Sequence, residues 1–169
     1  LISASDVAVF PEAYLAAILG GRGERPFTAE ILGEFEGPWL VAVTRGAAGV
    51  VARWRGRTIT VPALRLEDFG QRLTDTTGAG DAFHAGLLHV LLGDGRPPAE
   101  WTAELVCEAC RFGVQVAAFA CSRYGTKNSL PAEEYGRVFV SGPAVTEADP
   151  RAVALCAAGM RRLMCGGEA

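Results

Sequence analysis

The segment from Asp75 to Gly86 holds the densest set of residues that could do chemistry, and it reads Asp-Thr-Thr-Gly-Ala-Gly-Asp-Ala-Phe-His-Ala-Gly. Three small residues, Gly78-Ala79-Gly80, lead directly into a strongly helical stretch. Because no bulky side chain intervenes, their backbone N–H groups can approach a ligand closely. The start of the helix adds unpaired N–H donors and about half a positive charge. The segment therefore predicts an anion-binding hole that needs no lysine.

Asp81 follows these small residues and lies in the first turn of the expected helix. A carboxylate there can face an anion in the hole and accept a proton from a hydroxyl that attacks a phosphoryl group. The alternative is that the glycines end a loop and Asp81 only caps the helix. The residues alone leave both interpretations open. A dinucleotide-binding Gly-x-Gly-x-x-Gly motif is excluded, because Phe83 stands at the place of the third glycine.

The charges limit the class of protein further. The 169 residues carry 16 Lys plus Arg and 19 Asp plus Glu, which gives a net charge of −3. Nucleic acid and anionic membranes are disfavoured as partners, because both require a concentrated basic face. Lys127 is the only lysine and follows Thr126, whereas a Walker-type phosphate loop needs a lysine directly after glycine.

Cysteine and histidine usage indicates a reducing compartment and no metal-dependent hydrolase. The chain has 5 Cys and 2 His, and its first ten residues lack the basic and apolar regions of a secretory leader. No apolar run reaches the roughly 18 residues of a membrane span, so we expect a cytoplasmic protein with free thiols. Cys107 and Cys110 fall within a helical pattern without further ligands, which favours buried thiols over a metal site.

Strand and helix patterns alternate along the chain, which predicts an α/β layered architecture. Strands are expected at 6–10 and 39–44, the second one buried and parallel, and the runs 49–54 and 57–61 predict a hairpin. The stretch 64–75 has no regular pattern. Helices are expected at 11–19, 28–35, 79–92, 100–120 and 150–164.

Residues 75–83 resemble the signature of the ribokinase-like (PfkB) carbohydrate kinases. Three further segments resemble motifs of that family in the same order: residues 43–49 its nucleotide-side strand and turn, 111–120 its alanine-rich helix, and 122–131 the loop that closes the nucleotide pocket. The resemblance covers residues 5–140 and implies a three-layer α/β/α, Rossmann-like sandwich with a mostly parallel central sheet.

The resemblance also implies a sugar kinase that transfers the γ-phosphoryl group of ATP, with Mg²⁺, to a carbohydrate hydroxyl. Asp81 would be the general base, and the amides of Gly78, Ala79 and Gly80 would hold the charge of the transferring group. The implied ATP-binding residues are Thr44, Gly46, Gly49, Thr76, Thr77 and Val114. Many relatives bind a monovalent cation such as K⁺ beside the hole. The matching positions are Asp75, Thr77, Ala120, Gly125 and Ser129, with ordinary loop hydrogen bonding as the alternative.

One family motif is missing. Relatives usually carry an Asn-x-x-Glu that organises magnesium and phosphate, and here Pro11 and Tyr14 stand at its ends, a departure shared with ketohexokinase-type members. Glu12 is left as a carboxylate that could act through water. Family members are also much longer than this chain. We therefore expect the ATP-binding, catalytic half at 1–145 and a helical extension at 146–169, without the N-terminal sugar-binding half and lid.

Two other functions stay open at this point. One is a non-catalytic nucleotide-binding or interaction module, and the other is a ribokinase-like kinase that acts on a nucleoside or vitamin hydroxyl. A homodimer is compatible with either. His84, one turn after Asp81, is expected to pack against its surroundings rather than to act in a reaction.

Overall fold

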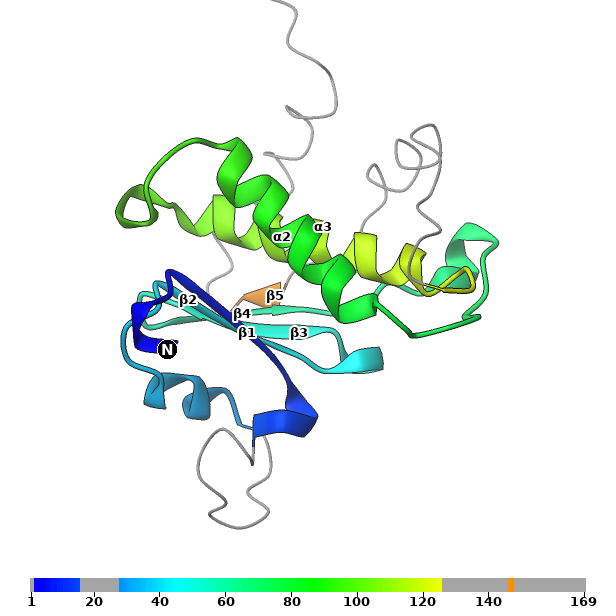
Figure 1. The fold of residues 1–169 in the computed structure, drawn as a ribbon, viewed down its shortest axis with the longest axis horizontal. Helices are drawn as coiled ribbons and strands as arrows, with labels where there is room; N and C mark the ends of the chain where they lie inside the picture. Colours follow the sequence, from blue (N-terminus) through cyan, green and yellow to red (C-terminus); the bar gives the residue numbers. More distant parts are fainter. Residues whose placement is uncertain (1, 16–27, 126–145, 148–169) are drawn as a thin grey trace, which may run out of the picture.

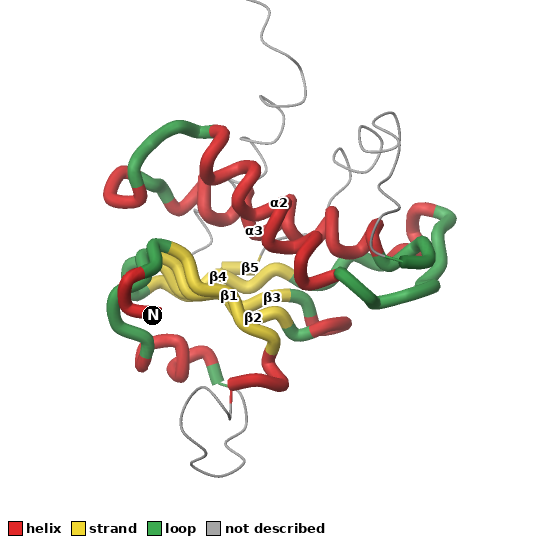
Figure 2. Tube along the Cα trace, viewed as in Figure 1, coloured by secondary structure: helices red, strands yellow, loops and turns green. Residues whose placement is uncertain are grey.

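The computed structural model describes residues 2–15, 28–125 and 146–147 and shows a sheet with two long helices along one face (Figure 1). The helices are α2 (Ala79–Gly93) and α3 (Ala103–Ala120). In spatial order, the strands are β1 (Val7–Pro11), β2 (Leu40–Thr44), β3 (Val50–Trp54), β4 (Arg57–Val61) and β5 (Thr146–Glu147). Short 3₁₀ segments cover the opposite face (Figure 2). The α/β class and the layered arrangement are therefore as predicted.

Strands β1 and β2 run parallel in a register that pairs Val7 with Leu40 and Pro11 with Thr44. Their carboxyl ends consequently lie at one edge of the sheet. The other described pairings, β2–β3, β3–β4 and β4–β5, are antiparallel, so this part of the sheet is less parallel than the family resemblance implies. A two-residue turn between β3 and β4 makes that pair a hairpin. Arg55 and Gly56 adopt φ of 48° and 78°, the positive values that a tight hairpin turn requires.

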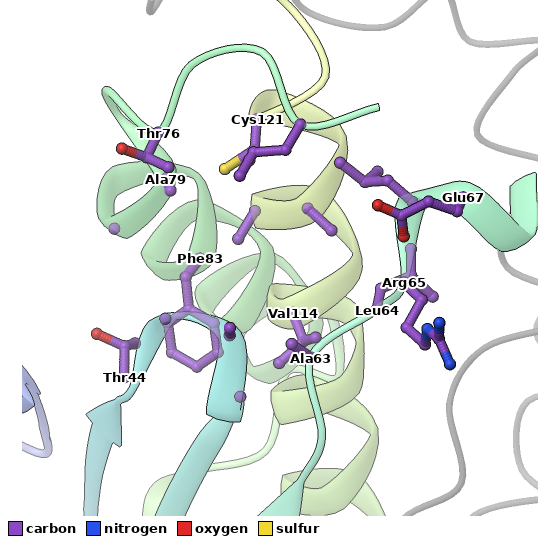
Figure 3. Close-up of a pocket in the computed structure, with 18 residues that line it drawn as sticks. Thr44, Ala63, Leu64, Arg65, Glu67, Thr76, Ala79, Phe83, Val114 and Cys121 are labelled. Atoms are coloured by element: carbon purple, nitrogen blue, oxygen red, sulfur yellow. The ribbon is translucent and has the colours of Figure 1, made fainter. Parts of the chain in front are cut away.

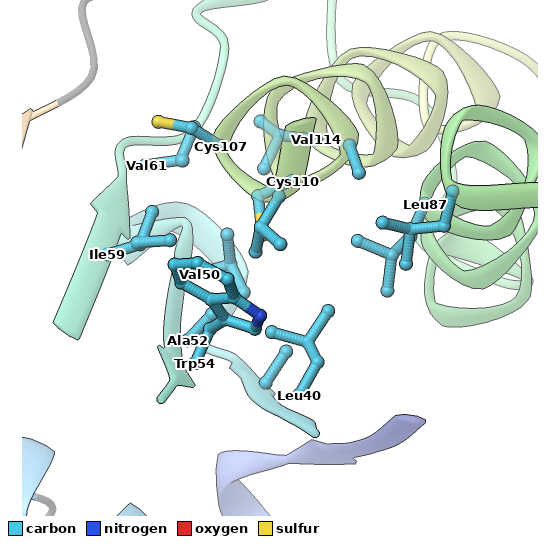
Figure 4. Packing of buried hydrophobic residues seen from close by; sticks show 14 of the residues in the cluster. Leu40, Val50, Ala52, Trp54, Ile59, Val61, Leu87, Cys107, Cys110 and Val114 are labelled. Carbon is cyan, nitrogen blue, oxygen red and sulfur yellow. The ribbon is translucent and has the colours of Figure 1, made fainter. Parts of the chain in front are cut away.

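The core lies on both faces of β2, which explains its uninterrupted apolar sequence. Successive strand residues point to opposite faces. Leu40 and Ala42 therefore join the main cluster under α2 and α3, while Val41 and Val43 join a smaller cluster on the other face. Figure 4 shows how the main cluster is filled from both layers, with Val50 and Ile59 from the sheet and Leu87, Cys107, Cys110 and Val114 from the helices.

Helices α2 and α3 approach each other closely at two glycines. A Cβ placed on Gly86 would come within 2.9 Å of the Gly113 Cα, and one on Gly113 would come within 2.9 Å of the Phe83 ring. Only glycine permits this contact, because a larger residue would separate the two helices. The close approach fixes how the start of α2 lies against the second half of α3.

The N-terminal helices differ from expectation. The predicted helix at 28–35 is a 3₁₀ segment, η3 (Ala29–Glu34), whose preceding Thr28 makes no side-chain capping bond. Burial of Ile31 and Leu32 against the sheet holds this short segment in place. The predicted helix at 11–19 begins as another 3₁₀ turn, η2 (Glu12–Tyr14), and residues 16–27 lie outside the described residues.

Two further boundaries also differ. The helix expected at 100–120 begins at Ala103, because the Thr102 side chain accepts a hydrogen bond from the Leu105 N–H at 3.3 Å and caps α3 there. A short 3₁₀ segment, η6 (Pro98–Glu100), precedes it. Thr146–Glu147 pairs with β4, so these two residues belong to the sheet rather than to a helical extension. The predicted helix at 150–164 lies outside the described residues.

Candidate active site

A cavity of about 420 Å³ lies between the N-terminal end of α2, the second half of α3 and the chain that follows β2 and β4. Figure 3 shows it from close by, with Thr76 and Ala79 at one end and Glu67 and Arg65 at the other. Its volume is within the range of small-molecule and cofactor sites. The described lining residues are Thr44, Gly46, Ala47, Gly49, Ala63, Leu64, Arg65, Leu66, Glu67, Leu73, Thr76, Ala79, Gly80, Phe83, Val114, Ala117, Ala118 and Cys121.

The loop at the start of α2 has the geometry of a tight turn. Gly78 adopts φ 81° and ψ 1°, a left-handed conformation that favours glycine. The Ala79 N–H donates to the Thr76 carbonyl at 3.2 Å, and the first bond of the helix runs from the Ala82 N–H to the Gly78 carbonyl at 2.9 Å. Of the three amides expected to hold an anion, that of Ala79 therefore already has an acceptor within the protein.

Gly80 lines the cavity and has open space beside its backbone. Apart from its chain neighbours and the backbone of its own helix, a Cβ added to Gly80 would meet no atom within 4 Å. Neither packing nor a positive φ therefore requires glycine at this position. An unfilled space beside a helix N-terminus is what close approach of a ligand to the backbone needs.

Asp81 is exposed in the first turn of α2, directly after Gly80. Its carboxylate makes no hydrogen bond or ion pair with another residue that the structure describes. His84, one turn later, interacts with its own helix, since its Nδ1 lies 2.8 Å from the Gly80 carbonyl oxygen and its ring packs edge-on against Phe83. Of these two side chains, only Asp81 has its polar atoms fully available to a substrate.

Asp75 ties the loop to the end of α3. One carboxylate oxygen accepts a hydrogen bond from the Thr77 N–H at 2.9 Å, and the other accepts one from the Gly125 N–H at 3.0 Å. The hydrogen bond from Thr77, followed by the one from Gly125, lowers the pKa of Asp75 below its ordinary value. The Asp75 amide itself donates to the Cys121 carbonyl at 3.1 Å. The carboxylate is therefore held in its charged form and joins two segments.

Cys121 caps α3 and lines the cavity. Burial, with the negative charge of Asp75 as a second cause, raises the pKa of its thiol. The thiol therefore stays protonated at neutral pH and is a poor nucleophile. It acts in this site as a small apolar wall.

Most of the residues expected to bind nucleotide do meet around the cavity. The lining includes Thr44, Gly46, Gly49, Thr76 and Val114, whereas Thr77 does not line it. Glycine at position 49 also has a structural reason, because its φ is 85° and a Cβ there would come within 2.1 Å of the Val61 carbonyl oxygen. The expected cation-site residues Asp75, Thr77 and Gly125 lie together through the Asp75 carboxylate, and Ser129 lies outside the described residues.

Sequence reasoning missed one wall of the cavity. Residues 63–67, which include the start of the 3₁₀ segment η5 (Leu66–Phe69), line the cavity beside α3 (Figure 3). Residues 64–74 have neither a period nor a motif, so nothing in the sequence marks them as part of a site. For the α3 wall of the cavity, the alanine-rich sequence is a signal, because small side chains leave space beside a helix.

The edge formed by the ends of β1 and β2 carries an ion pair. Glu12, in η2, lies 3.3 Å from the Nε of Arg45, which follows β2. Glu12 lies between Pro11 and Tyr14, the positions at which the family resemblance implies an Asn-x-x-Glu motif. In residues 2–15, 28–125 and 146–147, no three His, Cys, Asp or Glu side chains form a group that could hold a metal ion. Nor is any helix in those ranges long and apolar enough to cross a membrane.

Comparison with known proteins defines the class. The sequence profile of the "pfkB family carbohydrate kinase" matches residues 2–133, so the chain belongs to this family. A fructokinase of Klebsiella pneumoniae is 38% identical over 96 residues, which are 57% of this chain and 29% of that protein.

Two solved structures show the fold. The aminoimidazole riboside kinase of Salmonella enterica, complexed with aminoimidazole riboside and an ATP analog, has a TM-score of 0.63 at 23% identity and covers 79% of this chain and 41% of its own. The fructokinase of Vibrio cholerae O395, with fructose, ADP and calcium ion bound, has a TM-score of 0.58 at 27% identity and covers 75% and 38%. The chain thus spans less than half the length of each relative.

Proposed function

We propose that this chain is the ATP-binding, catalytic part of a kinase that phosphorylates a carbohydrate hydroxyl. The observation that carries the proposal is the cavity that ends at the N-terminus of α2, with Asp81 exposed in the first turn beside it. Membership of the pfkB family supports a carbohydrate as acceptor. The described lining supplies a nucleotide-sized space and a helix N-terminus for phosphates.

The reaction follows from the chemistry of the groups at that end of the cavity. The acceptor hydroxyl gives its proton to the Asp81 carboxylate, and its oxygen forms a bond to the γ-phosphorus of ATP. The bond from that phosphorus to the β–γ bridging oxygen breaks, and ADP leaves. Backbone N–H groups at Gly78 and Gly80 stabilise the charge on the transferring phosphoryl group, since preorganised donors are effective there. Ala79 contributes less, because its amide already donates to Thr76.

The nucleotide lies along the cavity, with its phosphates near Thr76 and Gly80 and its base near Val114. Thr44, Gly46 and Gly49 border it on the β2 side. Mg²⁺ bound to ATP would supply neutralisation of phosphate charge, and its contacts would be chiefly to phosphate oxygens and water. A monovalent cation beside Asp75, Thr77, Ala120, Gly125 and Ser129 stays part of the proposal, because each Asp75 oxygen retains a lone pair after accepting its amide bond.

The ion pair at the ends of β1 and β2 favours a second candidate, a non-catalytic nucleotide-binding module. Pro11 and Tyr14 stand where the family resemblance implies a magnesium-organising Asn and Glu, and Arg45 pairs with the nearby carboxylate of Glu12. The exposed Asp81 beside an open Gly80 argues for the kinase instead. Among the three cysteines that the structure describes, Cys107, Cys110 and Cys121, no disulfide forms, which supports a cytoplasmic kinase.

Measurement of ADP release by the intact protein separates the two functions. ATP and Mg²⁺ are supplied with a panel of acceptors that includes fructose, ribose and a nucleoside, and ATP binding is measured in parallel by calorimetry. The kinase proposal predicts that at least one acceptor raises ADP release well above the rate without acceptor. ATP binding with no stimulation by any acceptor would instead support the non-catalytic module.

A further inference from the structure

The end of the cavity farther from α2 is an apolar slot with charge on one side. Leu64 and Leu66 come from the segment after β4, and Val114, Ala117 and Ala118 come from α3. These side chains have no hydrogen-bond donor or acceptor, so they can contact the faces of a flat ring but cannot hydrogen-bond to it. Among the described lining residues, the charged side chains are Arg65 and Glu67, which flank Leu66. If a charged side chain of this lining contacts the edge of a nucleotide base, it is therefore one of these two.

The two charged side chains point in different directions. In Figure 3 the Glu67 carboxylate is directed across the cavity toward α3, on the side where Cys121 lies. The Arg65 guanidinium extends away from α3 in the same view. Glu67 is an exposed residue of η5. Its carboxylate is thus the charged group that can meet a ring held against Val114 and Ala117.

The loop at the start of α2, which forms the candidate anion hole, determines which part of a bound nucleotide lies near Glu67. Thr76, Ala79 and Gly80 lie at the end of the cavity beside the helix N-terminus, where phosphates are stabilised. The cavity continues from this end to the apolar slot. A nucleotide with its phosphates beside the helix N-terminus therefore places its base in the slot. The edge of the base then lies beside the Glu67 carboxylate.

We propose that Glu67 selects the nucleotide base by accepting a hydrogen bond from an amino group on the base edge, an inference that rests on the nucleotide site of the proposed function. An ionised carboxylate only accepts hydrogen bonds. It attracts the 6-amino group of adenine and repels the 6-carbonyl oxygen of hypoxanthine. The two bases have nearly the same shape, so the apolar slot alone does not distinguish them.

Two substitutions at Glu67 and one at its neighbour isolate this contribution. Glu67→Gln keeps the length of the side chain but supplies both a donor and an acceptor, and Glu67→Ala removes the polar group. Asp68→Ala is the matched control, because Asp68 is an exposed carboxylate of the same turn that does not line the cavity. Neither the Glu67 nor the Asp68 side chain is buried, so the three substitutions leave the apolar core unchanged.

The test is calorimetric binding of ADP and IDP to the intact wild-type protein and to the three variants. We expect the wild type and Asp68→Ala to bind ADP about 5- to 10-fold more tightly than IDP, the size of a charge-assisted hydrogen bond weakened by solvent. We expect the ratio of the two affinities to fall to about one in Glu67→Gln and Glu67→Ala.

The inference is overturned if the wild type does not distinguish ADP from IDP, or if the ratio survives in both Glu67 variants. It is also overturned if the preference for ADP over IDP falls to the same extent in Asp68→Ala, since the effect would then reflect the overall charge of the turn. These results leave nucleotide binding intact. Absence of any nucleotide binding would instead overturn the proposed function and this inference together.

Discussion

The side-chain carboxylate of Asp75 accepts a hydrogen bond from the backbone N–H of Gly125 at 3.0 Å, although 50 residues separate them in the sequence. Its other oxygen accepts the N–H of Thr77, which lies in the loop that leads to α2. One side chain therefore joins the loop before α2 to the turn after α3. The position of the candidate anion hole relative to the cavity depends on this connection.

Replacement of this carboxylate is expected to loosen the connection. In Asp75→Asn the amide nitrogen cannot accept a hydrogen bond, so one of the two backbone donors loses its acceptor. We expect a lower Tm at neutral pH and weaker nucleotide binding in the variant, measured by thermal unfolding and calorimetry. Asp68→Asn, an exposed aspartate in η5, is the control and should change neither quantity. Equal Tm values for wild type and Asp75→Asn at pH 7 would show that the connection does not hold the loop.

The pH dependence of this difference has a defined sign. The pKa of Asp75 is lowered in the folded protein below its ordinary value of 3.8. Its contribution is therefore fully present well above pH 3.8 and is lost as the pH falls through the folded pKa. The difference in Tm between wild type and Asp75→Asn should be constant near neutral pH and shrink below pH 3.8. A difference that grew on acidification would contradict this assignment.

The open space beside Gly80 predicts a variant that separates ligand binding from folding. Beyond its chain neighbours and its own helix backbone, a Cβ at this position meets no atom within 4 Å, and alanine favours helix over glycine by up to about 1 kcal/mol. Gly80→Ala should therefore unfold at an equal or higher temperature while nucleotide affinity falls, because the methyl group occupies the space of the phosphates. Gly93→Ala, at the other end of α2 with equally open surroundings, should keep nucleotide affinity unchanged. Equal affinities in the two variants would place the phosphates elsewhere.

The contact between α2 and α3 predicts the opposite behaviour at Gly113. A Cβ there would come within 2.9 Å of both the ring and the carbonyl oxygen of Phe83. Gly113→Ala should lower the free energy of unfolding by about 1–3 kcal/mol, the usual cost of overpacking. Because Phe83 also lines the cavity, nucleotide affinity should fall with it. Urea denaturation that gave the wild-type free energy would show that the helices tolerate the extra methyl group.

Local signals in the sequence predicted the parts of the fold that local interactions determine. The hairpin follows from two β-rich runs around Arg55-Gly56, and α2 follows from small residues at its start and an apolar period. The helix predicted at 28–35 is instead the 3₁₀ segment η3, in which Ile31 and Leu32 are buried. The two-residue strand β5 depends on pairing with β4, which no local pattern shows.

Part of the candidate site can likewise be predicted from the sequence, and part cannot. The small residues 78–80 and Asp81 lie in one continuous segment, so their spacing alone indicates their chemistry. The cavity wall at residues 63–67 comes from a stretch without periodicity, and only the fold brings it beside α3. Glu67 therefore could not be recognised as part of a site from the sequence.

Turnover and nucleotide affinity of Asp81→Asn in the intact protein test the central claim most directly. Asparagine has nearly the same shape as aspartate but cannot take a proton from the acceptor hydroxyl. If Asp81 is the general base, phosphoryl transfer to the stimulating acceptor should fall by about 100- to 10,000-fold. ADP affinity should stay at the wild-type value, because the cavity is unchanged. Turnover near the wild-type rate in Asp81→Asn would contradict the account.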